Sequence, residues 1–186
     1  MSAHRIHQIQ VLFSAEEDRL QLRINTHGRA EFRFWLTRRF IKRLWPGLRQ
    51  AMESQVQTET TAPVDPSNRA AVLSFVHQQA VSESDFATRF QEEVSETPLG
   101  PLPVLVTRAR IEPREQSGYL IGLHPQTSYG IEVAMDPKLL HSFCKLITDA
   151  VAKADWDLNL ILSPIGKVVT DMETLYGSNG SNYTIN

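Results

Sequence analysis

Residues 28–53 read GRAEFRFWLTRRFIKRLWPGLRQAME, and this stretch decides the expected fold. Its first half alternates apolar with polar side chains, as a half-buried strand does, and the apolar set is Phe32, Phe34 and Leu36. The apolar residues of its second half recur at helical spacing. Thr37 stands at the join, where its hydroxyl can accept an N–H of the first helical turn. The stretch therefore predicts a strand that leads directly into an amphipathic helix.

A second stretch with the same design lies 99 positions later, over residues 130–152. Moving the core positions of the first stretch by 99 gives an apolar residue each time: Ile131, Val133, Met135, Leu139, Leu140, Phe143, Ile147, Ala150 and Val151. Thr37 corresponds to Asp136, another capping residue, which is followed by Pro137 at the favoured first helical position. This agreement predicts an internal duplication.

Two alternating segments precede each of these stretches, so each half is predicted to contain three strands and a helix. The expected strands are His7–Phe13, Arg19–Thr26, 30–36, Val104–Glu112, Tyr119–His124 and Tyr129–Met135. The first helix is expected to kink or break at Pro46-Gly47, because proline removes a backbone hydrogen bond. The predicted class is α+β: two β-β-β-α repeats, over 6–54 and 104–155, form one pseudosymmetric domain of antiparallel sheet with helices on one face.

The segment between the repeats, 55–103, has no counterpart in the duplication. It is predicted to contain a polar linker and two acidic helices, the first from Pro66 and the second capped by Ser82 or Ser84 with Phe86 and Phe90 on one face. Beyond the second repeat, 156–186 is read as an extension whose end is disordered. Its apolar run Leu158–Leu162 is expected to pair with a sheet edge.

Composition and charge bound the function classes. No apolar run in the sequence is long enough for a membrane span, and no secretory signal is evident. The single cysteine, Cys144, favours a reducing compartment. We therefore expect a cytoplasmic protein. The net charge of −2 is unevenly spread. Residues 1–56 hold ten Lys and Arg against five Asp and Glu, whereas residues 57–100 hold two against seven. Such asymmetry indicates either binding to nucleic acid or to an acidic partner, or charge balance within the protein, and the internal balance is favoured.

Catalytic and cofactor motifs are not recognisable in the sequence. There is no phosphate loop, dinucleotide fingerprint or nucleophile elbow, so neither catalytic residues nor a cofactor is assigned. His141 and Cys144 lie three apart on a predicted helix, but two ligands are too few for zinc, and Cys144 is read as a packed thiol. No metal site is predicted.

One face of the first three strands carries the candidate binding residues. Arginines and an aromatic ring on a sheet can neutralise phosphates and stack on bases of a single strand. The residues assigned to this role are Arg19, Arg23, Arg33 and Trp35 on the strands, together with Arg38, Arg39 and Lys42 at the start of the helix that follows. In pattern, Gln8–Met52 and Thr107–Ala152 resemble the duplicated sheet-plus-helix folds of Whirly and PUR-type single-strand binders, whose repeats have four strands where this chain has three.

Three functions follow from these features. The first is a non-catalytic protein-binding or scaffold module that associates with itself or with another protein. The alternative is single-stranded nucleic-acid binding through the basic sheet face. A second alternative is an enzyme whose site lies between the repeats. What covers the outer face of the sheet is expected to discriminate among them.

Overall fold

Six strands form one mixed sheet in the order β1-β2-β3-β4-β5-β6 in the computed structural model, which describes residues 5–59, 65, 68–93, 95–115, 117–126 and 129–160. The strands are β1 (Ile6–Ser14), β2 (Arg19–Thr26), β3 (Glu31–Leu36), β4 (Val104–Pro113), β5 (Tyr119–Pro125) and β6 (Ile131–Met135). Three helices accompany them: α1 (Arg38–Glu59), α2 (Arg69–Ser82) and α3 (Pro137–Lys153). The α+β class is confirmed.

The sequence predicted an antiparallel sheet, and this prediction is wrong at one pair of strands. β3 and β4 pair in parallel, through Phe34 with Val104 and Trp35 with Leu105, while the other neighbours are antiparallel. The physical reason is the connection: the chain passes through α1, α2 and a long segment before β4, and parallel strands need such a crossover. This short parallel seam joins β1–β3 to β4–β6.

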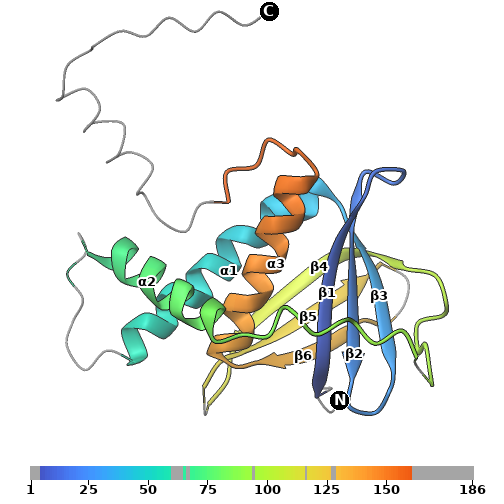
Figure 1. Cartoon of the computed structure of the whole chain (residues 1–186), viewed down its shortest axis with the longest axis horizontal. Coiled ribbons are helices and arrows are strands. Elements are labelled where there is room, and N and C mark those ends of the chain that lie inside the picture. Colours follow the sequence, from blue (N-terminus) through green and yellow to red (C-terminus); the bar gives the residue numbers. More distant parts are fainter. Residues whose placement is uncertain are drawn as a thin grey trace, which may run out of the picture.

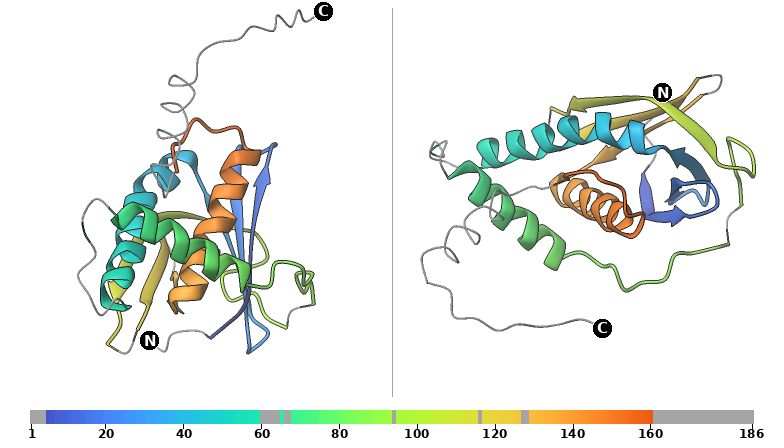
Figure 2. Two further views of the ribbon diagram at one scale, coloured as in Figure 1. Left: turned by 60° about the vertical axis from the view of Figure 1, so that its left-hand side comes forward. Right: turned by 90° about the horizontal axis from the view of Figure 1, so that it is seen from above.

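The sheet bends around two helices, as the views in Figures 1 and 2 show. α1 packs against β4, and α3 packs against β1, so each helix covers a strand of the half to which it does not belong. Side chains from both halves and both helices form one core, with Phe34 and Phe143 among the largest that are fully buried. Both predicted caps are present, because Thr37 Oγ1 accepts the N–H of Phe40 and Asp136 Oδ1 accepts that of Leu139.

α1 is continuous through Pro46, so of the predicted kink or break the break does not occur. Pro46 is exposed, whereas Leu44 and Leu48 on either side of it are buried. The lost backbone hydrogen bond therefore lies on the solvent side, and the packed side of the helix is uninterrupted. Gly47 also lets β4 approach closely, since a Cβ there would lie 3.0 Å from Ile111 Cδ1. α1 continues to Glu59, into the predicted linker.

Only one of the two helices predicted between the repeats is present among the described residues. α2 corresponds to the first, and its predicted start at Pro66 lies outside the described residues. The second is wrong: the chain leaves helical geometry after Ser82. The Asp85 carboxylate accepts the N–H groups of Ala87 and Thr88, which closes a local turn that competes with a helix.

The segment after α3 is anchored by Trp156. Its indole Nε1 donates to Asp18 Oδ1 at 2.8 Å, and its ring meets Phe13 edge-on. Leu158 and Leu160 are half-buried against the core, but residues 157–160 form no strand. Within one chain, the described part of Leu158–Leu162 therefore does not pair with a sheet edge as expected. Pairing with a second copy stays a prediction, and residues 161–162 lie outside the described residues.

Candidate functional site

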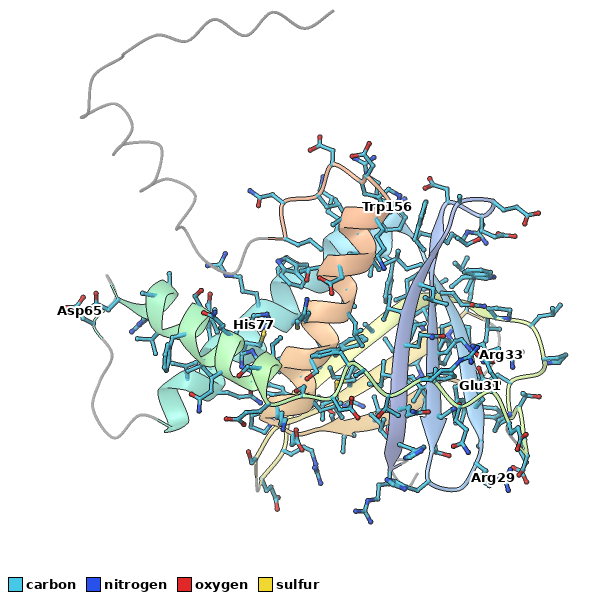
Figure 3. All side chains as sticks on the ribbon, in the orientation of Figure 1. Arg29, Glu31, Arg33, Asp65, His77 and Trp156 are labelled. Atoms are coloured by element: carbon cyan, nitrogen blue, oxygen red, sulfur yellow. The ribbon has the colours of Figure 1, made fainter. Side chains whose placement is uncertain are left out.

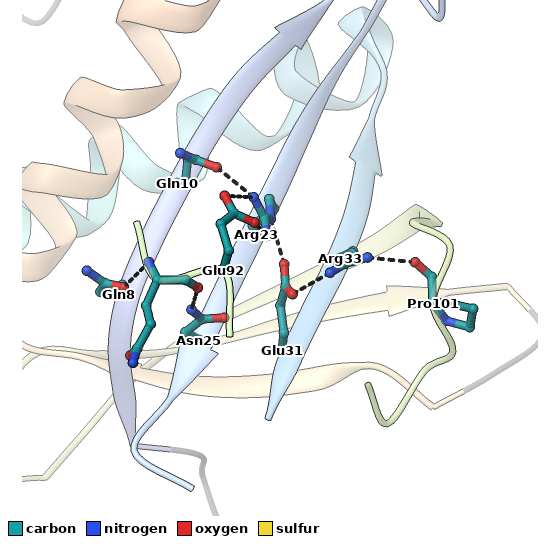
Figure 4. A network of polar contacts seen from close by, with 9 residues as sticks. Gln8, Gln10, Arg23, Asn25, Glu31, Arg33, Glu92 and Pro101 are labelled. Carbon is teal, nitrogen blue, oxygen red and sulfur yellow. Dashed lines mark hydrogen bonds and ion pairs between the residues drawn. The ribbon is translucent and has the colours of Figure 1, made fainter. Parts of the chain in front are cut away.

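The arginines of the outer sheet face form a buried ion cluster around Glu31, shown in Figure 4. Arg23 Nε donates to Glu31 Oε1 at 2.6 Å, and Arg33 Nη2 donates to Glu31 Oε2 at 2.6 Å. The Glu31 side chain is inaccessible to solvent. The strand register produces this cluster, because Arg23 lies opposite Arg33 and Asn25 lies opposite Glu31 on neighbouring strands. Two cations therefore share one fully desolvated carboxylate.

A strap formed by residues 89–93 and 95–101 covers these arginines from outside. The Glu92 carboxylate binds Arg23 through both oxygens, at 3.0 and 2.7 Å, and the Phe90 ring lies 4.4 Å from the guanidinium carbon. The strap backbone is also held: Asn25 donates to the carbonyl of Gln91, and the Gln8 side chain bonds the backbone on both sides of Phe90. The acidic middle of the chain thus contacts the basic first third.

The protonation states of this cluster follow from its contacts. Burial by itself would raise the pKa of Glu31, but the hydrogen bonds from Arg33 and Arg23 outweigh it and hold that pKa below the ordinary value. The hydrogen bond from Arg23 to Glu92 contributes most to raising the pKa of Arg23. All the charges are therefore present at neutral pH, and they compensate one another within the protein.

The remaining predicted binding residues are not gathered into one site. Arg19 pairs with Glu17 at 3.2 Å, and Trp35 is half-buried beside Gln21 and Leu105 on neighbouring strands. Arg38 donates to the carbonyl of Asp157 at 3.4 Å. Arg39 and Lys42 are exposed on the first turns of α1. Of the seven predicted residues, the sheet brings Arg23 and Arg33 together, and both are already engaged.

A groove of about 630 Å³ runs along the free edge of β1. Six consecutive β1 residues, 7–12, line one side of it, so both faces of the strand and its backbone border the groove. Among the described residues, β1 pairs only with β2, which leaves its other edge unpaired. The opposite walls are the first half of α3 and the chain between Ser84 and Phe90. We call this the β1 groove.

Apolar and polar side chains line the β1 groove in nearly equal numbers, and the apolar ones come from β1, α3, Phe86 and Phe90. Leu12 and Phe86 are 44% and 43% exposed, and Leu139, Phe143 and Leu146 of α3 form the floor. The carboxylates of Asp85 and Asp136 accept backbone N–H groups of their own turns. Ser84 and Ser142 hydrogen-bond each other at 2.7 Å. Among the described residues, no histidine bonds either hydroxyl, so a nucleophile with its base is not assembled here.

A pair of histidines, of which His141 is buried and His77 half-buried, lies where α2 packs against α3. Nδ1 of His77, labelled in Figure 3, is 3.0 Å from Nδ1 of His141. His141 is 1% exposed, and its Nε2 has no hydrogen-bond partner among the described residues. Burial, and then His77, lower the pKa of His141 to about 4; burial, and then Lys145, lower that of His77. The histidine that the sequence paired with Cys144 therefore meets another histidine, 64 positions away.

The described part of the chain contains no assembled set of metal ligands. No three His, Cys, Asp or Glu side chains lie close enough there to hold an ion. Cys144 is fully buried, and burial raises the pKa of its thiol. Nothing in the described helices is long and apolar enough to cross a membrane.

The sequence did not indicate the β1 groove or the histidine pair. Each depends on contacts between residues more than 50 positions apart, and neither leaves a local spacing signal. The alternation of His7–Phe13 did predict that β1 is a strand, but not that its outer edge is unpaired. In comparisons with protein-family models, curated proteins and solved structures, nothing matches this chain.

Proposed function

We propose that this chain is a non-catalytic protein-binding module that takes an extended segment of its partner into the β1 groove. The observation that carries the proposal is the unpaired edge of β1 along a groove lined by six consecutive residues of that strand. An exposed strand edge presents N–H and C=O groups ready to pair with another chain, and addition of a strand is a recurring mode of peptide recognition.

The dimensions of the groove suit this occupant. Six strand residues span about 20 Å, which is the length of a typical strand. Side chains of an added strand would point alternately toward the apolar floor on α3 and toward Leu12 and Phe86 at the rim. The preferred partner is therefore an extended segment with apolar residues at alternate positions. Main-chain hydrogen bonds would supply affinity, and the alternate side chains would supply selectivity.

The internal duplication is part of this proposal. It is supported by the order of elements, β-β-β-α on each side of α2, and by the way α1 covers β4 while α3 covers β1. In a duplicated fold β1 corresponds to β4, whose outer edge is paired with β3. The corresponding edge of β1 is the one left open. Superposition of residues 19–45 on residues 118–144, with Phe34 falling on Val133, is the geometric test of the duplication.

Self-association is the simplest form of the proposed binding, since a second copy brings its own extended segments. A copy that inserts a strand beside β1 would give a homodimer, and light scattering would report twice the monomer mass. Another protein with a suitable extended segment would bind in the same way. Both kinds of partner would bind by adding a strand beside β1, so a single set of variants tests both.

Nucleic-acid binding remains the second candidate, supported by the exposed cations Arg39 and Lys42 at the start of α1. The compensated charges of Arg23 and Arg33 favour the protein partner over it, because a phosphate would have to displace Glu92 from Arg23.

An enzyme would need a reactive pair in the groove. The engaged carboxylates of Asp85 and Asp136 and the Ser84–Ser142 pair give that alternative less support.

The experiment combines light scattering of the intact chain with fluorescence anisotropy of a labelled peptide. The peptide has about eight residues, alternating valine and threonine, with glutamates at its ends for solubility. The test variant is Leu12→Lys/Phe86→Lys, which places charge on both rims of the groove. The control is Phe75→Lys, because Phe75 is 68% exposed on α2 and does not line the groove.

We expect a dimer, peptide binding, or both, in the wild type. The groove variant should weaken the association at least about tenfold, while the Phe75 variant should leave it unchanged. A chain that stays monomeric at hundreds of micromolar and does not bind the peptide would overturn the proposal. Equal weakening by the groove variant and the control would also count against it, since that would place the contact elsewhere.

A further inference from the structure

We infer that the histidine pair His77–His141 is an acid-sensitive latch that holds α2 and the wall of the β1 groove against α3. The idea rests on the proposed function only for its consequence, namely that release of the latch changes the groove. The release itself is a property of α2 and can be measured without a ligand.

The latch is built from a small number of contacts. α2 meets α3 through the two Nδ1 atoms of the histidines, 3.0 Å apart, and the chain just after α2 meets it through Ser84 and Ser142, 2.7 Å apart. Leu73 is the one α2 side chain that is fully buried among the described residues, and Val72 and Val76 are partly buried against the core. The histidine and serine contacts add the polar part of the attachment of α2 to α3.

Protonation opposes this geometry. Two neutral imidazoles that face each other through Nδ1 share one proton in their hydrogen bond. A further proton either binds Nε2 of the donating ring, which makes a cation in the pair, or binds the second Nδ1, which places two donors face to face. Among the described residues, Nε2 of His141 has no partner to stabilise a cation. Because a buried unpaired charge is costly, acid favours any state in which the rings separate and reach water.

The surroundings supply no compensating negative charge. On α3, the positive charge of Lys145 helps to lower the pKa of His77, and Lys145 is itself paired with Asp149. Cys144, also on α3, carries a neutral thiol. α1 packs against both helices, and its buried side chains are uncharged: Ile41, Leu44, Trp45, Leu48, Ala51, Met52, Gln55 and Val56. No carboxylate among the described residues contacts either ring. Proton uptake is therefore unfavourable in the docked state on every side.

The connection to the groove is covalent and short. Ser84 follows α2 directly, and the residues from Ser84 to Phe90 form one wall of the β1 groove. A shift of α2 away from α3 would pull on Ser84 and change the width of the groove. Binding along β1 would then depend on pH through a site that does not touch the bound segment.

The direction of the effect follows from the lowered pKa values. Stability of the docked state is complete above the ordinary histidine value of about 6.5 and declines as pH falls from there toward about 4. If release returns His141 to its ordinary pKa, the population of the released state should rise up to about 30-fold between pH 7.5 and pH 5.0. His77, whose pKa is also lowered, adds to this in the same direction.

The test is amide hydrogen exchange of the intact chain over residues 73–88 at pH 7.5 and pH 5.0, corrected for the intrinsic pH dependence of exchange. The variant His77→Asn/His141→Asn keeps polar groups near the Nδ1 positions without a titrating ring. The control is His27→Asn, which removes an exposed histidine that does not line the β1 groove. Circular dichroism shows that each variant is folded.

Wild type and control should lose protection in α2 at pH 5.0, by about tenfold or more, while β2 and β5 stay protected. The latch variant should show the same α2 protection at both pH values. Equal protection of wild-type α2 at both pH values would overturn the latch. So would loss in the latch variant as large as in wild type, or loss spread evenly over the whole molecule. Should the latch variant fail to fold, the single variant His77→Asn answers the question.

Discussion

The carboxylate of Glu31 accepts a 2.6 Å hydrogen bond from Nε of Arg23 at a point where Glu31 has no contact with solvent. Arg33 completes the cluster from the other carboxylate oxygen. A lone buried carboxylate is strongly unfavourable, and two guanidinium groups make this one stable. The sequence predicts that the outer face of the sheet is a binding surface. In the structure this face contains a buried cluster of ions that compensate one another.

Removing the Glu31 charge should therefore destabilise the fold. We expect Glu31→Gln to lower the free energy of unfolding by about 3 kcal/mol, because it leaves Arg33 without its carboxylate and Arg23 with Glu92 alone. Urea unfolding monitored by tryptophan fluorescence measures this. The control is Glu53→Gln, which removes an exposed pair with Arg49 and should change stability by less than about 0.5 kcal/mol.

The same cluster sets a pH dependence. The pKa of Glu31 is lowered in the folded protein, so its contribution is complete above the ordinary value of 4.5 and is lost as pH falls through the lowered pKa. Wild type should lose stability in this acid range more steeply than Glu31→Gln. Parallel stability curves for the two proteins below pH 5 would contradict the assignment.

The two largest fully buried side chains should both be essential to stability. Phe34 on β3 and Phe143 on α3 have no exposed surface, and replacing either by alanine should cost about 3–5 kcal/mol in urea unfolding. Phe75→Ala on the exposed side of α2 should change stability by about 0.5 kcal/mol or less. A loss below about 1 kcal/mol for either core variant would contradict its burial.

Trp156 should anchor the segment after α3. Its ring is 8% exposed and packs on Phe13, so Trp156→Ala should lower the free energy of unfolding by about 3 kcal/mol. Trp156→Phe keeps most of that packing and loses the hydrogen bond to Asp18, at a cost of about 1 kcal/mol. Truncation after Asp155 should match the alanine variant in thermal melts. If truncation leaves the melting temperature unchanged, the anchor is unimportant.

Nucleic-acid binding should be weak at physiological salt, because Arg23 and Arg33 are compensated by Glu31 and Glu92. Anisotropy of a labelled single-stranded oligonucleotide measures it, with Arg39→Ala/Lys42→Ala as the variant. Tight binding that the variant abolishes, with a log–log salt slope near −3 for about four phosphates, would instead favour the second candidate function. Trp35→Ala then tests stacking, which is worth about 1–3 kcal/mol per base.

The sequence by itself determined the local structure of this protein. Alternation in Arg19–Thr26 and helical spacing after Thr37 predicted the elements correctly, since each pattern depends on side chains that share one element. The capping roles of Thr37 and Asp136 were equally predictable, because a cap and its N–H group are three residues apart. At Pro46, where a local rule competes with packing, the sequence predicted a kink or a break, and α1 is continuous there.

Only the tertiary structure decided what the surfaces do. The sequence could place Arg23 and Arg33 on one face, but not Glu92 upon them, because the strap reaches them from 69 positions away in a conformation without periodicity. The parallel seam of β3 with β4, the open edge of β1 and the meeting of His77 with His141 have the same origin. Each is set by how the two halves of the sheet bend around α1 and α3, and packing of that kind leaves no mark in the spacing of residues along the chain.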